Sequence, residues 1–140
     1  MENGTGFLLG RVHRALRSRW ELSLADLGLS APQASVLRAA GSRPGTGLRA
    51  LARVLGTDPM NVRRLVLRLE RLGLVELRTS NSDARLRMVV VTAQGQQLIA
   101  EIGLRAGEQE RRMVTLLGPE SHSRLRHQLL ELDAGLASSD

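Results

Sequence analysis

The chain has 140 residues, and 42% of them are hydrophobic, which is enough for one domain with a buried core. It has no cysteine and no apolar run of about eighteen residues, which excludes disulfides, thiol-based redox sensing and a membrane span. The net charge is +6, and residues 49–87 carry nine arginines against four acidic residues, a local balance of +5. Such a basic region favours a polyanionic partner such as nucleic acid. The sequence shows no secretory signal, so we expect a cytoplasmic protein.

The first predicted element is a long amphipathic helix over residues 6–27. Its apolar stripe includes Phe7, Val12, Leu16 and Trp20, and arginines surround this stripe. A terminal helix with so much apolar surface needs a partner. That partner is either the core of its own domain or another subunit.

A second helix is predicted to begin at a capping box, in which Ser30 caps the backbone and Gln33 returns the hydrogen bond. Val36 and Leu37 lie on its apolar face, and the helix is expected to end near Gly41. Residues 42–47 contain one proline and two glycines, which is typical of a loop.

Residues 48–72 are predicted to form two helices joined by a tight turn. Gly56 is placed to end the first helix in a left-handed conformation, and Asp58 and Pro59 supply the cap and first residue of the second. Apolar residues recur at helical spacing through both helices, at Leu48, Leu51, Ala52, Leu55, Val62, Leu65, Val66 and Leu69. An ordinary helical hairpin has the same spacing, but the small residue, turn glycine and buried valine favour a DNA-binding helix-turn-helix.

A β-hairpin is predicted after Gly73, which closes the second of these helices. Residues 75–78 alternate apolar and polar, and residues 86–91 are rich in β-branched side chains. The polar segment around Asp83 gives the hairpin a basic tip that includes Arg85 and Arg87. Such a hairpin is either a wing that contacts DNA or a structural cover for the core, and the two interpretations are compatible.

Two helices are predicted to complete the chain. Thr92 can cap the first, which continues to Leu117 and stops at the Gly-Pro pair 118–119. Gly103 and Gly107 weaken this helix by about 1 kcal/mol each relative to alanine, unless they permit close helix packing. The last helix has leucines at heptad-like spacing, namely Leu125, Leu129, Leu132 and Leu136.

Several local motifs accompany this order of elements. They are Leu51-Ala52, Leu55-Gly56, Val62, Arg64-Leu65-Val66, Arg68-Leu69, Gly73-Leu74-Val75-Glu76, Asp83-Ala84-Arg85 and Val91-Thr92-Ala93-Gln94-Gly95. Together they resemble the MarR family of winged helix-turn-helix regulators, with Val91 where the family commonly has leucine.

The resemblance implies a mainly α-helical fold with a small β-hairpin wing, in a single domain over residues 1–140. Within it, residues 30–92 would form the winged helix-turn-helix part, and residues 1–29 and 93–140 the dimerisation helices. The resemblance also implies a cytoplasmic homodimer that regulates transcription, usually as a repressor, by binding a palindromic double-stranded DNA operator. Members often release DNA when a small phenolic or anionic ligand binds.

The expected DNA contacts lie on the two motif helices, on the turn between them and on the hairpin. Asn61 is the candidate for adenine readout and Arg63 or Arg64 for guanine, because these side chains can bond bidentately to those bases. We expect Arg85 at the wing tip to enter a minor groove and Arg87 to lie beside it. Phosphate contacts are expected from Arg49, Thr57 and Arg68.

Met60 and Leu67 depart from the family's usual pattern on this helix. They either contact thymine methyl groups or weaken and alter DNA binding. They keep open the alternative of a winged-helix protein-interaction module with weak or no specific DNA binding. Asp83 either orients Arg85 or is a solvated turn residue.

An enzyme is the other competing class. The sequence has no phosphate-binding glycine loop, no paired carboxylates and no nucleophile with a base, so we expect neither catalytic residues nor a cofactor. His122 and His127 are five residues apart, which places them on different helix faces, so no metal site is expected and both are expected at the surface. Trp20 is expected either in the core or as the stacking wall of a ligand pocket.

Overall fold

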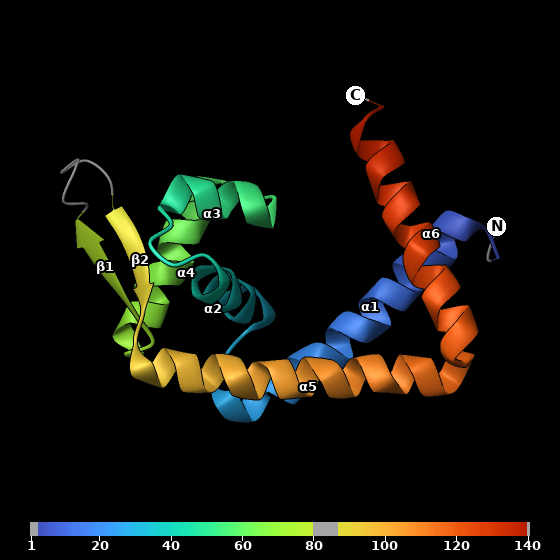
Figure 1. Ribbon diagram of the computed structural model, residues 1–140, viewed down its shortest axis with the longest axis horizontal. Helices are drawn as coiled ribbons and strands as arrows, with labels where there is room; N and C mark the ends of the chain where they lie inside the picture. Colours follow the sequence, from blue (N-terminus) through green and yellow to red (C-terminus); the bar gives the residue numbers. More distant parts are fainter. Residues whose placement is uncertain (1–2, 80–86, 140) are drawn as a thin grey trace. The chain divides into compact units, whose positions relative to one another are not determined.

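The computed structural model describes residues 3–79 and 87–139 (Figure 1). Its elements in chain order are α1 (Thr5–Leu24), the short 3-10 helix η1 (Ala25–Leu27), α2 (Ala31–Ser42), α3 (Leu48–Leu55), α4 (Pro59–Arg71), β1 (Val75–Thr79), β2 (Arg87–Val91), α5 (Ala93–Leu117) and α6 (Pro119–Ala137). The chain forms two compact units, Met1–Gly103 and Leu104–Asp140. The expected mainly helical fold with a two-stranded hairpin is confirmed. Among the described residues, no helix is long and apolar enough to cross a membrane.

The first helix is shorter than its apolar stripe predicts. The α-helix ends at Leu24, and the last turn of the predicted segment is the 3-10 helix η1. Gly28 follows in the left-handed conformation, with φ of +71°, and its N–H donates to the Ala25 carbonyl at 3.1 Å. This glycine turns the chain toward α2, because a left-handed residue cannot continue the helix.

The core of the first unit is built from apolar residues of the helices and of the hairpin. Its largest fully buried side chains are Leu24, Val36, Leu37, Leu51, Val62, Val66, Leu69, Val75, Val89 and Ile102. Trp20 is half-buried and packs against this cluster. The packing holds α2, α3, α4 and the hairpin together.

The hairpin is antiparallel, with Val75 opposite Val91 and Thr79 opposite Arg87. β1 runs one residue beyond its predicted end at Arg78. Leu86, the predicted start of the second strand, lies outside the described residues, and β2 is described from Arg87.

The start of α5 is fixed to the end of α4. The Thr92 hydroxyl donates to the Gly73 carbonyl at 2.7 Å and accepts the Gly95 N–H at 3.1 Å, which makes it the expected helix cap. A Cβ on Gly95 would lie 2.1 Å from the Leu74 carbonyl oxygen, so only glycine fits there. Gly103, by contrast, has no non-neighbouring atom within 4 Å of a Cβ, so it serves no close packing within the described chain.

The second unit consists of the end of α5 and all of α6, which Gly118 joins with φ of +85°. His122 is half-buried, not at the surface as expected, and its Nε2 lies 2.7 Å from Glu110 Oε1. No residue from 104 to 139 is buried. The α6 leucines in particular stay accessible, with exposed fractions of 39% for Leu125, 41% for Leu129, 44% for Leu132 and 64% for Leu136.

Candidate nucleic-acid interface

The turn between α3 and α4 has the predicted geometry. Gly56 is left-handed, with φ of +67°, and the next N–H, from Thr57, bonds to the Ala52 carbonyl at 3.0 Å. Asp58 then caps α4, because its carboxylate accepts the Asn61 N–H at 2.9 Å. Pro59 occupies the first turn, where its missing N–H costs nothing. These local contacts fix where α4 begins and how it leaves the turn.

The two faces of α4 have opposite character. Val62, Leu65, Val66 and Leu69 are buried and attach the helix to the core. The outward face carries exposed side chains over its whole length, at Met60, Arg63, Arg64, Arg68 and Arg71, with Leu67 half-buried among them. Because the buried face fixes α4 to the core, the arginines on the opposite face are held in solvent.

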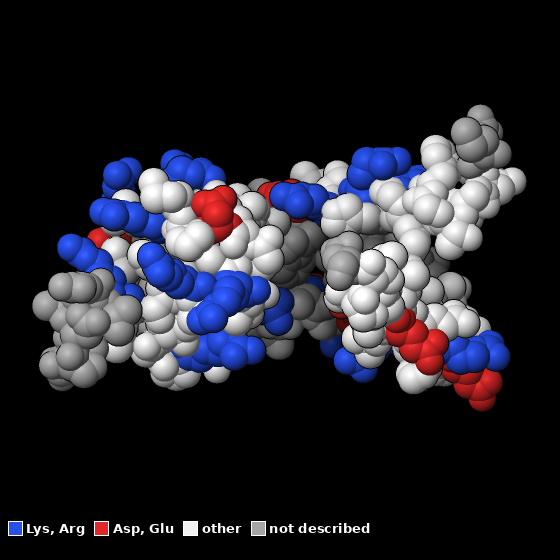
Figure 2. All heavy atoms as spheres, turned by 90° about the horizontal axis from the view of Figure 1, so that it is seen from above, with Lys and Arg blue, Asp and Glu red and all other residues white. Residues whose placement is uncertain are grey.

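Arginines gather on the part of the first unit that contains α3 and α4. Figure 2 shows blue side chains clustered over this region with few acidic side chains among them. Arg49 is exposed in the first turn of α3, and Arg87 is exposed at the start of β2. Clustered cations on a rigid surface attract a polyanion, and arginine forks match phosphate and guanine geometry.

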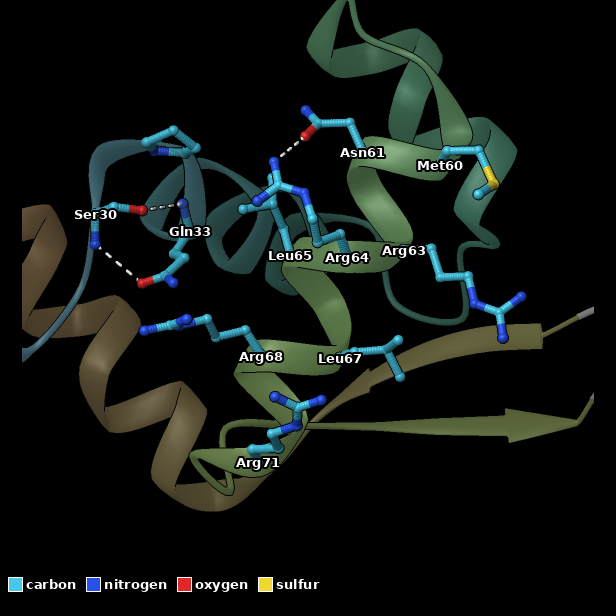
Figure 3. Close-up of a pocket in the computed structure, with 11 residues that line it drawn as sticks. Ser30, Gln33, Met60, Asn61, Arg63, Arg64, Leu65, Leu67, Arg68 and Arg71 are labelled. Carbon is cyan, nitrogen blue, oxygen red and sulfur yellow. Dashed lines mark hydrogen bonds between the residues drawn. The ribbon is translucent and has the colours of Figure 1, made fainter.

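A groove of about 680 Å³ runs between α4 and the start of α2 (Figure 3). Arg64 and Arg68 extend on the side of α2, whereas Arg63 extends on the side of the two strands. The lining of the groove also includes residues that the sequence did not indicate as site residues, namely Ser30, Pro32, Gln33, Leu65 and Arg71. No sequence motif predicted that α2 would line this groove, because α2 lies there only through its packing on α4.

The start of α2 has few backbone donors to offer a ligand. The Ala31 N–H donates to the carboxylate of Glu21 at 3.3 Å, and the Gln33 N–H donates to the Ser30 hydroxyl at 3.3 Å. Pro32 has no N–H. The predicted capping box is complete, since the Gln33 side chain also accepts the Ser30 N–H at 3.0 Å. Anion binding in this groove therefore depends on the arginine side chains.

Three of the predicted contact residues form one hydrogen-bonded chain. The Asn61 amide donates to the Thr57 hydroxyl at 3.1 Å, and its carbonyl oxygen accepts from Arg64 Nη2 at 2.5 Å. The bond between Asn61 and Arg64 is drawn in Figure 3. The sequence indicated three separate contacts, but the structure connects them along one edge of α4.

The hairpin is anchored on both sides. The Glu70 carboxylate on α4 accepts the Leu77 N–H of β1 at 3.0 Å. On the other strand, the Val89 N–H donates to the Thr46 carbonyl at 3.0 Å. These bonds set the hairpin's position beside α4. Arg85, the predicted minor-groove contact, lies outside the described residues, as does Asp83.

A second groove of about 430 Å³ lies on the same unit, away from the outward face of α4. It is lined by Asp26, Leu27, Leu72, Leu74, Gln94, Gln97 and Leu98. Trp20, the predicted ligand contact, is not among these residues. Among the described residues, no group of three or more histidine, cysteine or acidic side chains could hold a metal ion.

Three kinds of comparison agree on what this chain resembles. The MarR family's sequence pattern matches residues 29–86. Transcriptional regulator HosA of Escherichia coli is 32% identical over 83 residues, which cover 59% of this chain and 60% of that protein. The match thus spans about three-fifths of the length of this curated relative.

Solved structures extend the likeness over nearly the whole chain. CouR from Rhodococcus jostii, bound to p-coumaroyl-CoA, is 27% identical with a TM-score of 0.81, and the match covers 94% of this chain and 92% of that one. A MarR family protein of Mycobacterium tuberculosis in complex with salicylic acid is also 27% identical, with a TM-score of 0.73 and coverage of 92% and 96%. Sequence pattern, relatives and fold thus agree that this chain is similar to MarR family proteins.

Proposed function

We propose that this protein is a sequence-specific regulator of transcription. It would bind double-stranded DNA as a homodimer and repress the genes that it controls. The observation that carries the proposal is α4, a helix held by its buried face and pinned beside a hairpin, with arginines along its solvent side. A helix of this diameter fits the DNA major groove, and the adjacent hairpin would lie along the flanking backbone.

The proposed contacts divide into reading and positioning. Arg63 and Arg64 would contact base edges from the middle of α4, where the helix enters the groove most deeply. Phosphates would be held by Arg49, Thr57 and Arg68. Arg85, from the segment that the structure does not describe, would enter the minor groove, with Arg87 beside it. At the start of α2, phosphate binding would depend on side chains, because the backbone N–H groups of Ala31 and Gln33 already donate to Glu21 and Ser30.

The proposed dimer is supported by apolar surface that no part of the described chain covers. Besides the α6 leucines, α1 exposes Phe7 by 46%, Leu8 by 42% and Val12 by 53%. Exposed apolar stripes on helices of this kind indicate an interface. We propose residues 1–29 and 93–140 as the dimerisation helices and residues 30–92 as the DNA-binding part, so that two copies of α4 would read a palindromic operator.

We further propose that a small phenolic or anionic ligand releases the DNA. The support is that two relatives were solved with compounds of this chemistry, p-coumaroyl-CoA and salicylic acid. Trp20 is the proposed ligand contact, because it is only half-buried and an indole ring can stack on a phenolic ligand. The role is regulatory and not catalytic, and its place is the cytoplasm, where the DNA is.

Fluorescence anisotropy on the DNA upstream of the protein's own gene tests this function. The wild type should bind with a steep dependence of log K on log salt, because each neutralised phosphate contributes about 0.9 to the slope. Arg68→Ala should weaken binding to every sequence and reduce the slope by about one. Arg38→Ala is the matched control and should change neither, because Arg38 is an exposed arginine of α2 that lies outside both the arginine groove and the proposed dimerisation helices. Equal slopes for both variants would remove Arg68 from the interface.

A further inference from the structure

We propose that Asn61 does not read a base itself but positions Arg64, so that the chain Thr57–Asn61–Arg64 acts as one reading unit. The inference rests on the proposed DNA-binding function and changes its assignment of residues. Sequence alone predicts that Asn61 reads adenine and that Arg63 or Arg64 reads guanine, as separate contacts. The hydrogen bonds in the structure point to a single readout position.

Both ends of the Asn61 side-chain amide form hydrogen bonds within the protein. Its NH₂ group donates to the Thr57 hydroxyl, four residues back, and its oxygen accepts from Arg64, three residues on. The orientation follows from chemistry, because a guanidinium has only donors and must face the amide oxygen. The amide therefore lies along the helix surface, linking one turn to the next.

Adenine readout requires a different arrangement. An asparagine that binds adenine presents its NH₂ to N7 and its oxygen to the N6 amino group, with both ends facing the base. Here one end faces Thr57 and the other faces Arg64. To read adenine, Asn61 would have to break both hydrogen bonds, including the bond to a charged donor, which is the stronger kind.

Arg64 keeps enough donors to read a base while bonded to Asn61. A guanidinium carries five N–H groups, and the bond to Asn61 uses one of them on Nη2. The remaining donors still form the fork that matches O6 and N7 of guanine. A long, exposed arginine normally loses rotamer freedom when it binds, and a side chain already held by a neighbour loses less.

Thr57 completes the unit from the turn before α4. Its N–H bonds to Ala52 and its side chain is half-buried, so its hydroxyl has a fixed place. That hydroxyl accepts from Asn61 and retains its own proton, which can still go to a phosphate. The turn thus sets the amide, and the amide sets the arginine.

Operator selection from a randomised half-site tests the assignment. Arg64→Ala should lose discrimination at one G·C pair in each half-site, by about ten- to a hundredfold. Asn61→Ala should lose part of the preference, about three- to tenfold, at that same pair and at no A·T pair. Thr57→Val should behave like Asn61→Ala, whereas Thr57→Ser, which keeps the hydroxyl, should retain the wild-type preference. Arg63→Ala is the control, because Arg63 is not part of this hydrogen-bonded chain. It should change the preference at a different base pair.

A second measurement needs no DNA. In the free wild type, nitrogen-15 relaxation of the Arg64 side chain should show an ordered guanidinium, and Asn61→Ala and Thr57→Val should each make it mobile. The inference is overturned if Arg64 is equally mobile in all three proteins, or if Asn61→Ala loses an A·T preference that Arg64→Ala keeps. Selection of no sequence by the wild type would instead overturn the proposed function, and the positioning role with it.

Discussion

Replacing Leu129 and Leu132 of α6 with alanine should weaken the proposed dimer by a predictable amount. In the single chain these side chains are 41% and 44% exposed, so about two-fifths of each remains to be buried by a partner. Complete burial of a leucine side chain contributes about 1.5–3 kcal/mol, so the remaining part contributes about 1 kcal/mol. The α-helix itself should persist, because alanine has the highest helix propensity.

The effect is doubled by symmetry. The double variant alters two side chains in each of two subunits, so the loss is about 3–4 kcal/mol after allowing for the alanine methyl groups. That loss raises the dimer dissociation constant roughly a hundred- to a thousandfold. Operator affinity should fall in parallel, because a monomer engages only one half-site.

Sedimentation equilibrium over a range of protein concentrations measures this directly. Leu72→Ala is the matched control, because Leu72 is a leucine of similar exposure, 46%, at the end of α4 and outside the proposed dimerisation helices. It should leave the monomer–dimer equilibrium unchanged. If the double variant and the control dimerise equally, the leucines of α6 do not form the interface.

Three further predictions concern stability and ligand response. Asp58→Ala removes the cap of α4 and should lower the free energy of unfolding by about 1 kcal/mol in urea titrations at fixed protein concentration, with a loss under 0.3 kcal/mol contradicting the capping role. Gly95→Ala should destabilise by more than 2 kcal/mol, because its Cβ would meet the Leu74 carbonyl, whereas Gly103→Ala should stabilise by about 0.5–1 kcal/mol; equal effects would refute the close contact. Salicylate should raise the melting temperature of the free protein and lower operator affinity in anisotropy, and Trp20→Ala should abolish both responses.

Much of the fold was predictable because its signals are local. A capping box, a turn glycine or an aspartate before a proline acts through neighbours within four residues, so Ser30, Gly56 and Asp58 fulfil their predicted roles. The buried face of α4 was equally readable from spacing. The prediction for the first helix was wrong in the last turn. Gly28 redirects the chain there, and periodicity alone does not show where an α-helix tightens into a 3-10 helix.

The arrangement of the site was harder to predict because it depends on packing and on competition between hydrogen-bond partners. The approach of α2 to α4 brings Gln33 into the arginine groove, and no short sequence motif encodes that distance. Asn61 could be named as a polar residue on the outward face, but its commitment to Thr57 and Arg64 depends on rotamers. The role of His122, bonded to Glu110 across the turn between α5 and α6, was likewise missed.

The ratio of specific to non-specific DNA affinity tests the central proposal most directly. It requires one purified protein, the DNA upstream of its gene, and a shuffled duplex of equal length and composition, titrated at the same physiological salt concentration. A sequence-specific regulator should bind the upstream DNA at least about a thousandfold more tightly than the shuffled duplex. Equal affinities for the two duplexes would contradict sequence-specific recognition by α4.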